Sequence, residues 1–265
     1  MKKIAWLLMA WLMAVAVAGA DQTAAEPLRV LSLSAAATAV LDQLGVPPVA
    51  IDRYGLTAMP GGRALVIGRG EAVSREKLLE WKIQCAVLWY YQQESVERFR
   101  AQGIRCEVIP KLRLADYPVL VRRMGELTGR QAAADKLAAG FEAEMAALRA
   151  APAERPVRVY FELYTPWKGA GHESYMGDLI RCAGGRSILP ESGLSSPEFV
   201  VKAAPEVIFY VEGFGDAAEI AARPGMAAVP AVKKQRIIPV PRKWVVEGVD
   251  PASAIGFLRA GIRDR

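Results

Sequence analysis

Short apolar runs alternate with mixed apolar and polar segments along the first part of the chain, and this alternation predicts strands and helices. The apolar runs are β-like, whereas the mixed segments have the composition and the ends of helices. Strands are expected at residues 29–33, 49–51, 85–90 and 105–109, and helices at residues 35–44, 74–81 and 94–102. Strands that alternate with helices predict a parallel sheet.

A different pattern occupies residues 130–150, which are rich in Ala, Leu, Glu and Lys. These residue types are strong helix formers, and Gly140 is the only glycine inside the segment. A helix of this length would extend for about 30 Å. The prolines within residues 151–156 end it. Beyond them, strands are expected at residues 157–161, 206–211 and 236–240, and helices at residues 172–182 and 252–262.

The two halves of the chain contain an internal repeat. Residues 74–91 align without a gap on residues 196–213, because each begins with a serine, has an acid two residues later, and continues as a helix and a strand. The spacing of 122 residues is too long for a solenoid. The expected fold is therefore α/β, with two Rossmann-like lobes whose parallel sheets are joined by one long backbone helix.

The expected boundaries follow from this pattern. The N-terminal lobe covers residues 28–115, a helical segment with the bridging backbone helix covers residues 116–151, and the C-terminal lobe covers residues 156–265.

The chain begins with the pattern of a secretory signal peptide at residues 1–20. Lys2 and Lys3 precede an apolar stretch over residues 4–18, and Ala18-Gly19-Ala20 matches a cleavage site. A transmembrane anchor is the alternative, but the apolar run is short for a span. We therefore expect cleavage after Ala20 and export to the periplasm.

Composition narrows the function. Hydrophobic residues make up 52% of the chain and charged residues 23%, as in a folded soluble protein. The single histidine, His172, excludes poly-histidine metal sites, and three cysteines without a CxxC pair exclude a disulfide scaffold. The net charge is +6, but the basic residues form no arginine-rich stripe in the sequence. No nucleic acid partner is therefore expected. Whether Cys85 and Cys106 form a disulfide stays open.

Aromatic and cationic residues follow the expected strands, at the edge where open parallel sheets bind ligands. They include Tyr54, Trp89, Tyr90, Trp167, Arg242 and Trp244. Aromatic faces beside cations suit a large, flat or anionic ligand. His172 begins a helix next to Glu173 and Ser174, and three consecutive residues do not form a catalytic triad. We therefore expect a binding protein, with an exported enzyme as the less favoured alternative.

Residues 29–38, 74–82 and 170–185 resemble matching segments of the helical-backbone periplasmic binding proteins, which deliver vitamin B12, ferric siderophores or haem to ABC importers. The resemblance extends over residues 28–262, although Ala35 and Ala39 stand where the family usually has Pro and Glu. It implies a monomeric receptor rather than an enzyme. It also implies an ABC permease and ATPase complex in the inner membrane as partners. A metal chelate would be the cargo, and no resident cofactor or metal ion is expected.

The resemblance assigns a second role to Glu76 and Glu198. Each is an acid in the first turn of an expected helix, where it interacts favourably with the helix dipole and needs no other function. In the family, the two matching glutamates, one on each lobe, meet arginines of the importer. Because the internal repeat makes the two positions equivalent, we favour permease docking.

The resemblance leaves the cargo open. A tyrosine that binds iron in haem-binding members corresponds to Arg69 here, and arginine is not an ordinary haem ligand. A ferric siderophore and a corrinoid are therefore favoured equally, and haem is the alternative. The expected ligand contacts are Tyr54, Arg69, Trp89, Tyr90, Trp167, His172, Arg242 and Trp244.

Overall fold

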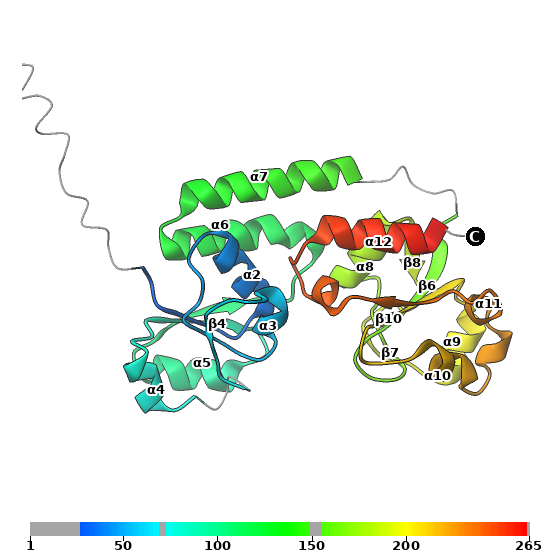
Figure 1. Cartoon of the computed structure of the whole chain (residues 1–265), viewed down its shortest axis with the longest axis horizontal. Helices are drawn as coiled ribbons and strands as arrows, with labels where there is room; N and C mark the ends of the chain where they lie inside the picture. Colours follow the sequence, from blue (N-terminus) through cyan, green and yellow to red (C-terminus); the bar gives the residue numbers. More distant parts are fainter. Residues whose placement is uncertain (1–26, 69–72, 149–154, 264–265) are drawn as a thin grey trace, which may run out of the picture.

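The computed structural model describes residues 27–68, 73–148 and 155–263, and these form two α/β lobes side by side with helices along one side of both (Figure 1). Residues 1–20, where a signal peptide is expected, lie outside the described residues, as do Arg69 and residues 149–154. None of the described helices is long and apolar enough to cross a bilayer.

The N-terminal lobe is built on a five-stranded sheet in which every pairing is parallel, as expected. The strand order is β3-β2-β1-β4-β5. The strands are β1 (Val30–Ser32), β2 (Ala50–Ile51), β3 (Leu65–Val66), β4 (Cys85–Trp89) and β5 (Arg105–Ile109). The helices of this lobe are α2 (Ala35–Gln43), α3 (Gly55–Ala58), α4 (Arg75–Glu80) and α5 (Gln93–Arg100).

The C-terminal lobe has a mixed sheet whose parallel centre was expected and whose antiparallel edge was not. The order is β11-β10-β6-β7-β9, with β8 also paired to β6. The strands are β6 (Val157–Glu162), β7 (Lys168–Gly169), β8 (Gly185–Ser187), β9 (Gly193–Leu194), β10 (Val207–Val211) and β11 (Ile237–Val240). The helices are α8 (Tyr175–Cys182), α9 (Pro197–Ala203), α10 (Ala217–Ala222), α11 (Pro230–Lys233) and α12 (Pro251–Arg263). The short 3-10 helices η3 (Met226–Ala228) and η4 (Arg242–Val245) lie between them.

The internal repeat is present in the structure. Ser74 and Ser196 are the N-caps of α4 and α9, and each hydroxyl accepts a hydrogen bond from the backbone N–H three residues later. A serine cap contributes about 1 kcal/mol to a helix. In both lobes the capped helix leads into the next parallel strand, β4 or β10.

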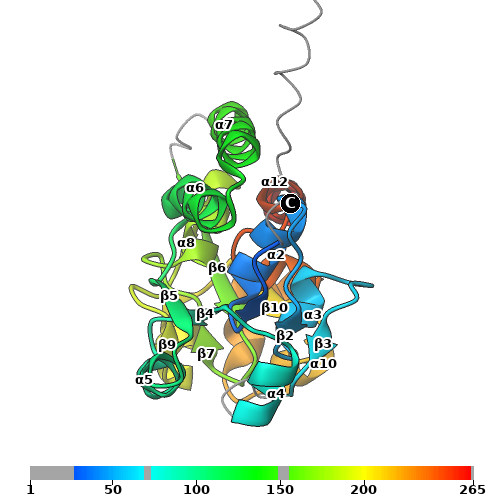
Figure 2. The same ribbon diagram turned by 90° about the vertical axis from the view of Figure 1, so that its left-hand side faces the viewer.

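One long helix bridges the lobes, as expected, and a second helix packs against it. The expected helix is α7 (Gln131–Leu148), and it packs antiparallel against α6 (Tyr117–Thr128) (Figures 1 and 2). The reversal occurs at Gly129, whose φ of 69° favours glycine. Gly125 allows the close approach, because a Cβ there would overlap the side chain of Ala134. In this helical hairpin α6 also contacts α2 of the N-terminal lobe, and α7 also contacts α12 of the C-terminal lobe.

A single hydrophobic core extends through both lobes. It contains buried residues of both sheets, such as Val87 and Phe209, together with Met124, Phe141 and Ile255 of the surrounding helices. Two smaller clusters lie within one lobe each, around Phe99 and around Tyr160. The two lobes are consequently packed as one unit on the side that these helices cover.

The structure contains no disulfide between Cys85, Cys106 and Cys182. Cys85 pairs with Arg105 and Ala86 pairs with Cys106 in the parallel register, so Cys85 and Cys106 are offset by one residue. Successive side chains of a strand point to opposite faces of the sheet, and the two thiols accordingly belong to different core clusters. Burial raises the pKa of Cys85 to about 12.

Asp178 attaches the end of the first lobe to the second. Its carboxylate, 4% exposed, accepts hydrogen bonds from Arg113 Nε at 2.9 Å, Arg113 Nη2 at 2.6 Å and the backbone N–H of Leu114 at 3.0 Å. Arg181 of the same helix also donates to it. Leu114 begins the 3-10 helix η2 (Leu114–Asp116), which precedes α6. Asp178 thus fixes the point at which the chain enters the helical hairpin.

We predict that Asp178→Asn destabilises the protein by about 2 kcal/mol, because the amide has one acceptor oxygen where the carboxylate has two, and buried donors of Arg113 and Leu114 lose their partner. Burial raises the pKa of Asp178, but the hydrogen bonds from Arg113 and Leu114 leave it below the ordinary value. The stabilisation is therefore complete above the ordinary Asp pKa, about 3.9, and is lost as the pH falls through the lower folded-state pKa. Urea unfolding at several pH values measures both effects.

The control is Glu173→Gln, which removes the other carboxylate bound to Arg113. The side chain of Glu173 is 61% exposed, so its loss should cost less than about 1 kcal/mol. Equal destabilisation by the two variants would contradict the assignment.

Candidate functional site

A cavity of about 710 Å³ lies between the two lobes. Its first wall comes from the N-terminal lobe, with residues after β2, residues after β4, and Lys111 and Leu112 after β5. Its second wall comes from the segments around β7, the start of α8, Arg242 and residues 245–247. This volume falls in the range of pockets that enclose a small-molecule ligand.

Four of the expected ligand contacts line this cavity. They are Tyr54, Trp89, Tyr90 and Arg242. Trp89 stacks on Tyr91 with ring centroids 6.3 Å apart, and Tyr90 meets Tyr91 edge to face at 5.3 Å. The end of β4 therefore presents a preformed aromatic cluster to the cavity.

Trp167 is outside the lining of the cavity. It adopts a left-handed backbone conformation with a φ of 63°, and its backbone N–H donates to Glu162 Oε2 at 2.9 Å. Its indole lies 5.1 Å from the guanidinium of Arg223, which itself forms an ion pair with buried Glu162. Trp167 thus packs within the second lobe.

Trp244 and His172 are also outside the lining. Trp244 packs on Phe257 of α12, with ring centroids 5.0 Å apart. His172 donates from its backbone N–H to the carbonyl of Leu189, and its own carbonyl accepts from Arg113 at 3.5 Å. Both residues therefore make contacts within the protein and do not line the cavity.

The cavity is also lined by residues outside the set of expected ligand contacts. They are Tyr91, Tyr164, Tyr175, Lys111, Lys168 and Glu247, among others. Tyr91, Tyr164 and Lys168 come after strands that the sequence predicts, so the sequence indicates them by the same pattern as Trp89. Tyr175 begins α8 and Glu247 lies between η4 and α12, where only the tertiary fold brings them to the cavity.

Five tyrosines therefore surround the cavity: Tyr54, Tyr90, Tyr91, Tyr164 and Tyr175. The hydroxyl of Tyr54 accepts a hydrogen bond from Arg53 Nη2 at 2.9 Å. The hydroxyl of Tyr175 is committed to the structure, because it accepts a hydrogen bond from the backbone N–H of Gly248 at 3.0 Å. Phenol groups of this kind offer oxygen atoms on an otherwise aromatic surface.

Cations outnumber carboxylates on the described lining. Lys111, Lys168 and Arg242 carry positive charge, and the Arg242 guanidinium lies 5.3 Å from the ring centroid of Phe214. Of the two carboxylates, Asp52 accepts hydrogen bonds from the N–H groups of Tyr54 and Gly55, at the start of α3.

Glu247 is the other carboxylate of the lining. Burial raises its pKa above the ordinary glutamate value. Burial, and after it the charge of Glu247, also raises the pKa of Tyr91 to about 12. Glu247 therefore places a costly negative charge among the tyrosines.

Glu76 and Glu198 lie away from the cavity lining, in the first turns of α4 and α9. Both side chains are exposed, and hydrogen bonds from the backbone N–H of the same residue and from the Ser74 or Ser196 hydroxyl lower the pKa of each. In Figure 1, α4 and α9 are on the opposite side of the molecule from α7. The two acids thus have equivalent surroundings on the two lobes.

A cavity between two α/β lobes, lined by both and held by a helical connection, defines a two-lobed ligand-binding protein. The model of the periplasmic binding protein family matches residues 30–243. The chain belongs to this family, whose members are substrate-binding proteins of ABC-type transporters and not enzymes. Membership implies an ABC transporter as partner, a small-molecule ligand, and a periplasmic or other extracytoplasmic location.

Solved structures agree with this assignment. RhuT, a periplasmic haem-binding protein from Roseiflexus sp. RS-1, is 25% identical, with a TM-score of 0.77 over 89% of this chain and 98% of RhuT. The periplasmic haem-binding protein HutB of Vibrio cholerae is 19% identical, with a TM-score of 0.76 over 88% of this chain and 98% of HutB. The vitamin B12-binding protein BtuF of Vibrio cholerae is 17% identical, with a TM-score of 0.74 over 89% of this chain and 97% of BtuF. The comparison with curated proteins gives no match.

We predict that Glu247→Gln stabilises the protein at pH 8 and has little effect near pH 4. Because burial raises the folded-state pKa of Glu247, its protonated form is favoured on folding, and that advantage is lost as the pH rises through the raised value. Removing the charge should therefore raise the Tm only where the wild-type carboxyl is ionised. Thermal unfolding at the two pH values measures the difference, and an equal shift at both would contradict it.

Proposed function

We propose that this protein captures a flat or compact, acidic iron(III) chelate between its lobes and delivers it to the permease of an ABC importer. The observation that carries the proposal is the cavity itself, in which five tyrosines and three cations face one interlobe space. The aromatic rings provide area for a flat ligand. The lysines and Arg242 provide partners for carboxylate or catecholate groups on its rim.

Iron is favoured over cobalt as the cargo metal by the oxygen chemistry of the lining. Tyrosine is an established ligand of haem iron, and phenol hydroxyls also donate hydrogen bonds to the oxygens of a chelate. A corrinoid rim is neutral and gains less from the excess of cations. Tyr54 is the best placed of the tyrosines to hold a metal, because the guanidinium of Arg53 compensates negative charge on its oxygen.

The structural neighbours support a metal chelate without choosing one. RhuT and HutB are haem-binding proteins, and BtuF binds vitamin B12. Haem and a ferric siderophore share the chemistry that the cavity favours, a flat or compact iron(III) complex with acidic groups. They are therefore the two sources that the experiment distinguishes.

We predict that the purified protein binds haemin or a ferric tricatecholate with one-to-one stoichiometry and binds cyanocobalamin more weakly. Titration followed by absorption spectroscopy separates the sources: a shifted Soret band identifies haem, and a perturbed charge-transfer band identifies the catecholate. Tyr91→Ala should weaken binding at least tenfold, because truncation of an aromatic contact in a pocket costs roughly 2 kcal/mol.

Trp244→Ala is the matched control. Trp244 is an aromatic residue near the cavity that packs on Phe257, so its truncation should lower the Tm and leave affinity within about threefold. Tight binding of cyanocobalamin with no binding of either iron chelate would refute the proposed cargo.

We further propose that Glu76 and Glu198 dock the receptor on the importer. Their exposure, their equivalent positions in the repeat and their distance from the cavity lining support this role. Rim charges on an interface mainly govern encounter and orientation of the partners. The acids would each meet a cation on one of two equivalent permease subunits.

We predict that Glu76→Ala and Glu198→Ala weaken association with the cognate permease complex and leave chelate affinity unchanged. The effect should decrease at high salt, because exposed charges are screened. Vesicle-reconstituted transport and chelate titration provide the two measurements. Glu80→Ala, an exposed acid at the other end of α4, is the control and should change neither. If the two docking variants lost chelate binding, the two glutamates would belong to the ligand-binding site, and the docking role would be contradicted.

A further inference from the structure

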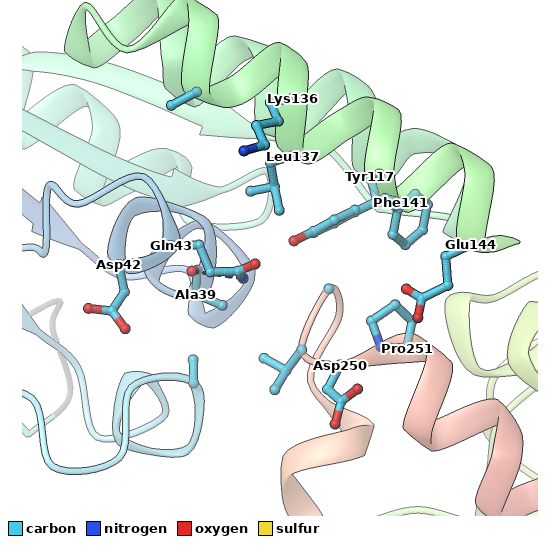
Figure 3. A pocket seen from close by; sticks show the side chains of 15 residues that line it. Ala39, Asp42, Gln43, Tyr117, Lys136, Leu137, Phe141, Glu144, Asp250 and Pro251 are labelled. Carbon is cyan, nitrogen blue, oxygen red and sulfur yellow. Dashed lines mark hydrogen bonds between the residues drawn. The ribbon is translucent and has the colours of Figure 1, made fainter.

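A second cavity, of about 770 Å³, opens on the side of the molecule where α7 runs (Figure 3). We call it the rear groove. Its walls come from both lobes and from the helical hairpin, and it is lined by Ala39, Asp42, Gln43, Ala58, Tyr117, Ala133, Lys136, Leu137, Gly140, Phe141, Glu144 and residues 248–251. Among the described residues, none of these also lines the interlobe cavity, so the rear groove is a separate site.

The floor of the rear groove is apolar and aromatic. Tyr117 of α6 and Phe141 of α7 pack with their ring centroids 4.6 Å apart. Leu137 and Ala39 continue this surface from α7 and α2. In Figure 3 the hydroxyl of Tyr117 points into the groove. Tyr117 and Phe141 are only 3% and 8% exposed, so they close the bottom of the groove without offering free ring faces. The accessible apolar surface lies above them, around Leu137, and accepts an apolar body.

The charged groups of the rear groove are predominantly acidic. Asp42, Glu144 and Asp250 carry carboxylates, and Lys136 is the one cation that the described residues contribute to the lining. Within the described part of the chain, Asp42 and Glu144 form no ion pair or side-chain hydrogen bond. Lys136 lies eight positions before Glu144 on α7, about 12 Å away along the helix axis, too far to neutralise it. The groove therefore offers negative charge above an apolar floor.

We propose that the rear groove is a binding site for a small organic cation that carries an ammonium group on an aromatic or apolar body. The charge complements Glu144, Asp250 and Asp42, and the body fits the apolar surface around Leu137, above the buried rings of Tyr117 and Phe141. An anionic ligand of the same shape is disfavoured by the same carboxylates. This inference is independent of the cargo assigned to the interlobe cavity.

A substitution at Gly140 can test whether a ligand binds in the rear groove. Gly140 lines the groove in the middle of α7, and no atom lies within 4 Å of the position that a Cβ would occupy there. A larger side chain can therefore fill the groove without a clash, and it replaces the poor helix propensity of glycine. Gly256 is a matched position: it lies inside α12, a Cβ on it would likewise meet no atom within 4 Å, and it does not line the groove.

The experiment uses three probes with one indole body: tryptamine, which is cationic, tryptophol, which is neutral, and indole-3-acetate, which is anionic. Isothermal titration calorimetry of the purified protein should detect tryptamine, with weaker binding of tryptophol and none of indole-3-acetate. Gly140→Leu should abolish tryptamine binding and Glu144→Gln should weaken it about fivefold, whereas Gly256→Leu should leave it unchanged. Tyr91→Ala, in the interlobe cavity, should also leave it unchanged.

Three results would overturn the proposal. Equal binding of tryptamine and indole-3-acetate would show that charge does not select the ligand. Retained tryptamine binding in a folded Gly140→Leu variant would show that the probe binds elsewhere. A dimer in light scattering that Gly140→Leu dissociates would assign the groove to a second copy of the chain instead.

Discussion

The contact between Asp178 and the Arg113-Leu114 segment is the constraint on which the rest of the structure depends. It attaches the chain that leaves β5 to the first turns of α8 before that chain enters α6. Lys111 and Leu112, just before the contact, belong to one part of the cavity, and Tyr175, just before Asp178, belongs to another. One carboxylate therefore sets the spacing of the groups that a ligand meets. Its burial is tolerated because donors on the backbone, Arg113 and Arg181 together replace its hydration.

The segment between η4 and α12 separates two sites of different chemistry. Val245, Val246 and Glu247 face the interlobe cavity, and residues 248–251 face the rear groove. Gly248 lies between two aromatic residues, since its N–H donates to Tyr175 and a Cβ there would overlap the ring of Tyr117. A glycine is required at this position both by the contact with Tyr117 and by its φ of 80°. The two sites thus share a thin wall fixed from both sides.

The sequence predicted the fold well where its signal was local. Apolar runs predicted β4, β6 and β10, and the serine-capped repeat predicted α4 and α9. The two-residue strands β2, β3, β7 and β9 have too few positions for a period, so the pattern found only the first of them. The site was predicted in part, because residues that directly follow strands do reach the cavity. Trp167 follows a strand too, but its left-handed backbone and the Glu162–Arg223 pair hold it within its own lobe, and no local pattern encodes that contact.

The shared core has a consequence for how this chain can be divided. Residues of both sheets, of α6 and α7, and of α12 belong to one cluster, so the lobes are separate in outline but not in their packing. A fragment that ended after β5 would leave the inner face of α2 and one side of its own sheet exposed to water. Neither lobe is therefore an autonomous folding unit, and the protein should unfold in one cooperative transition rather than lobe by lobe.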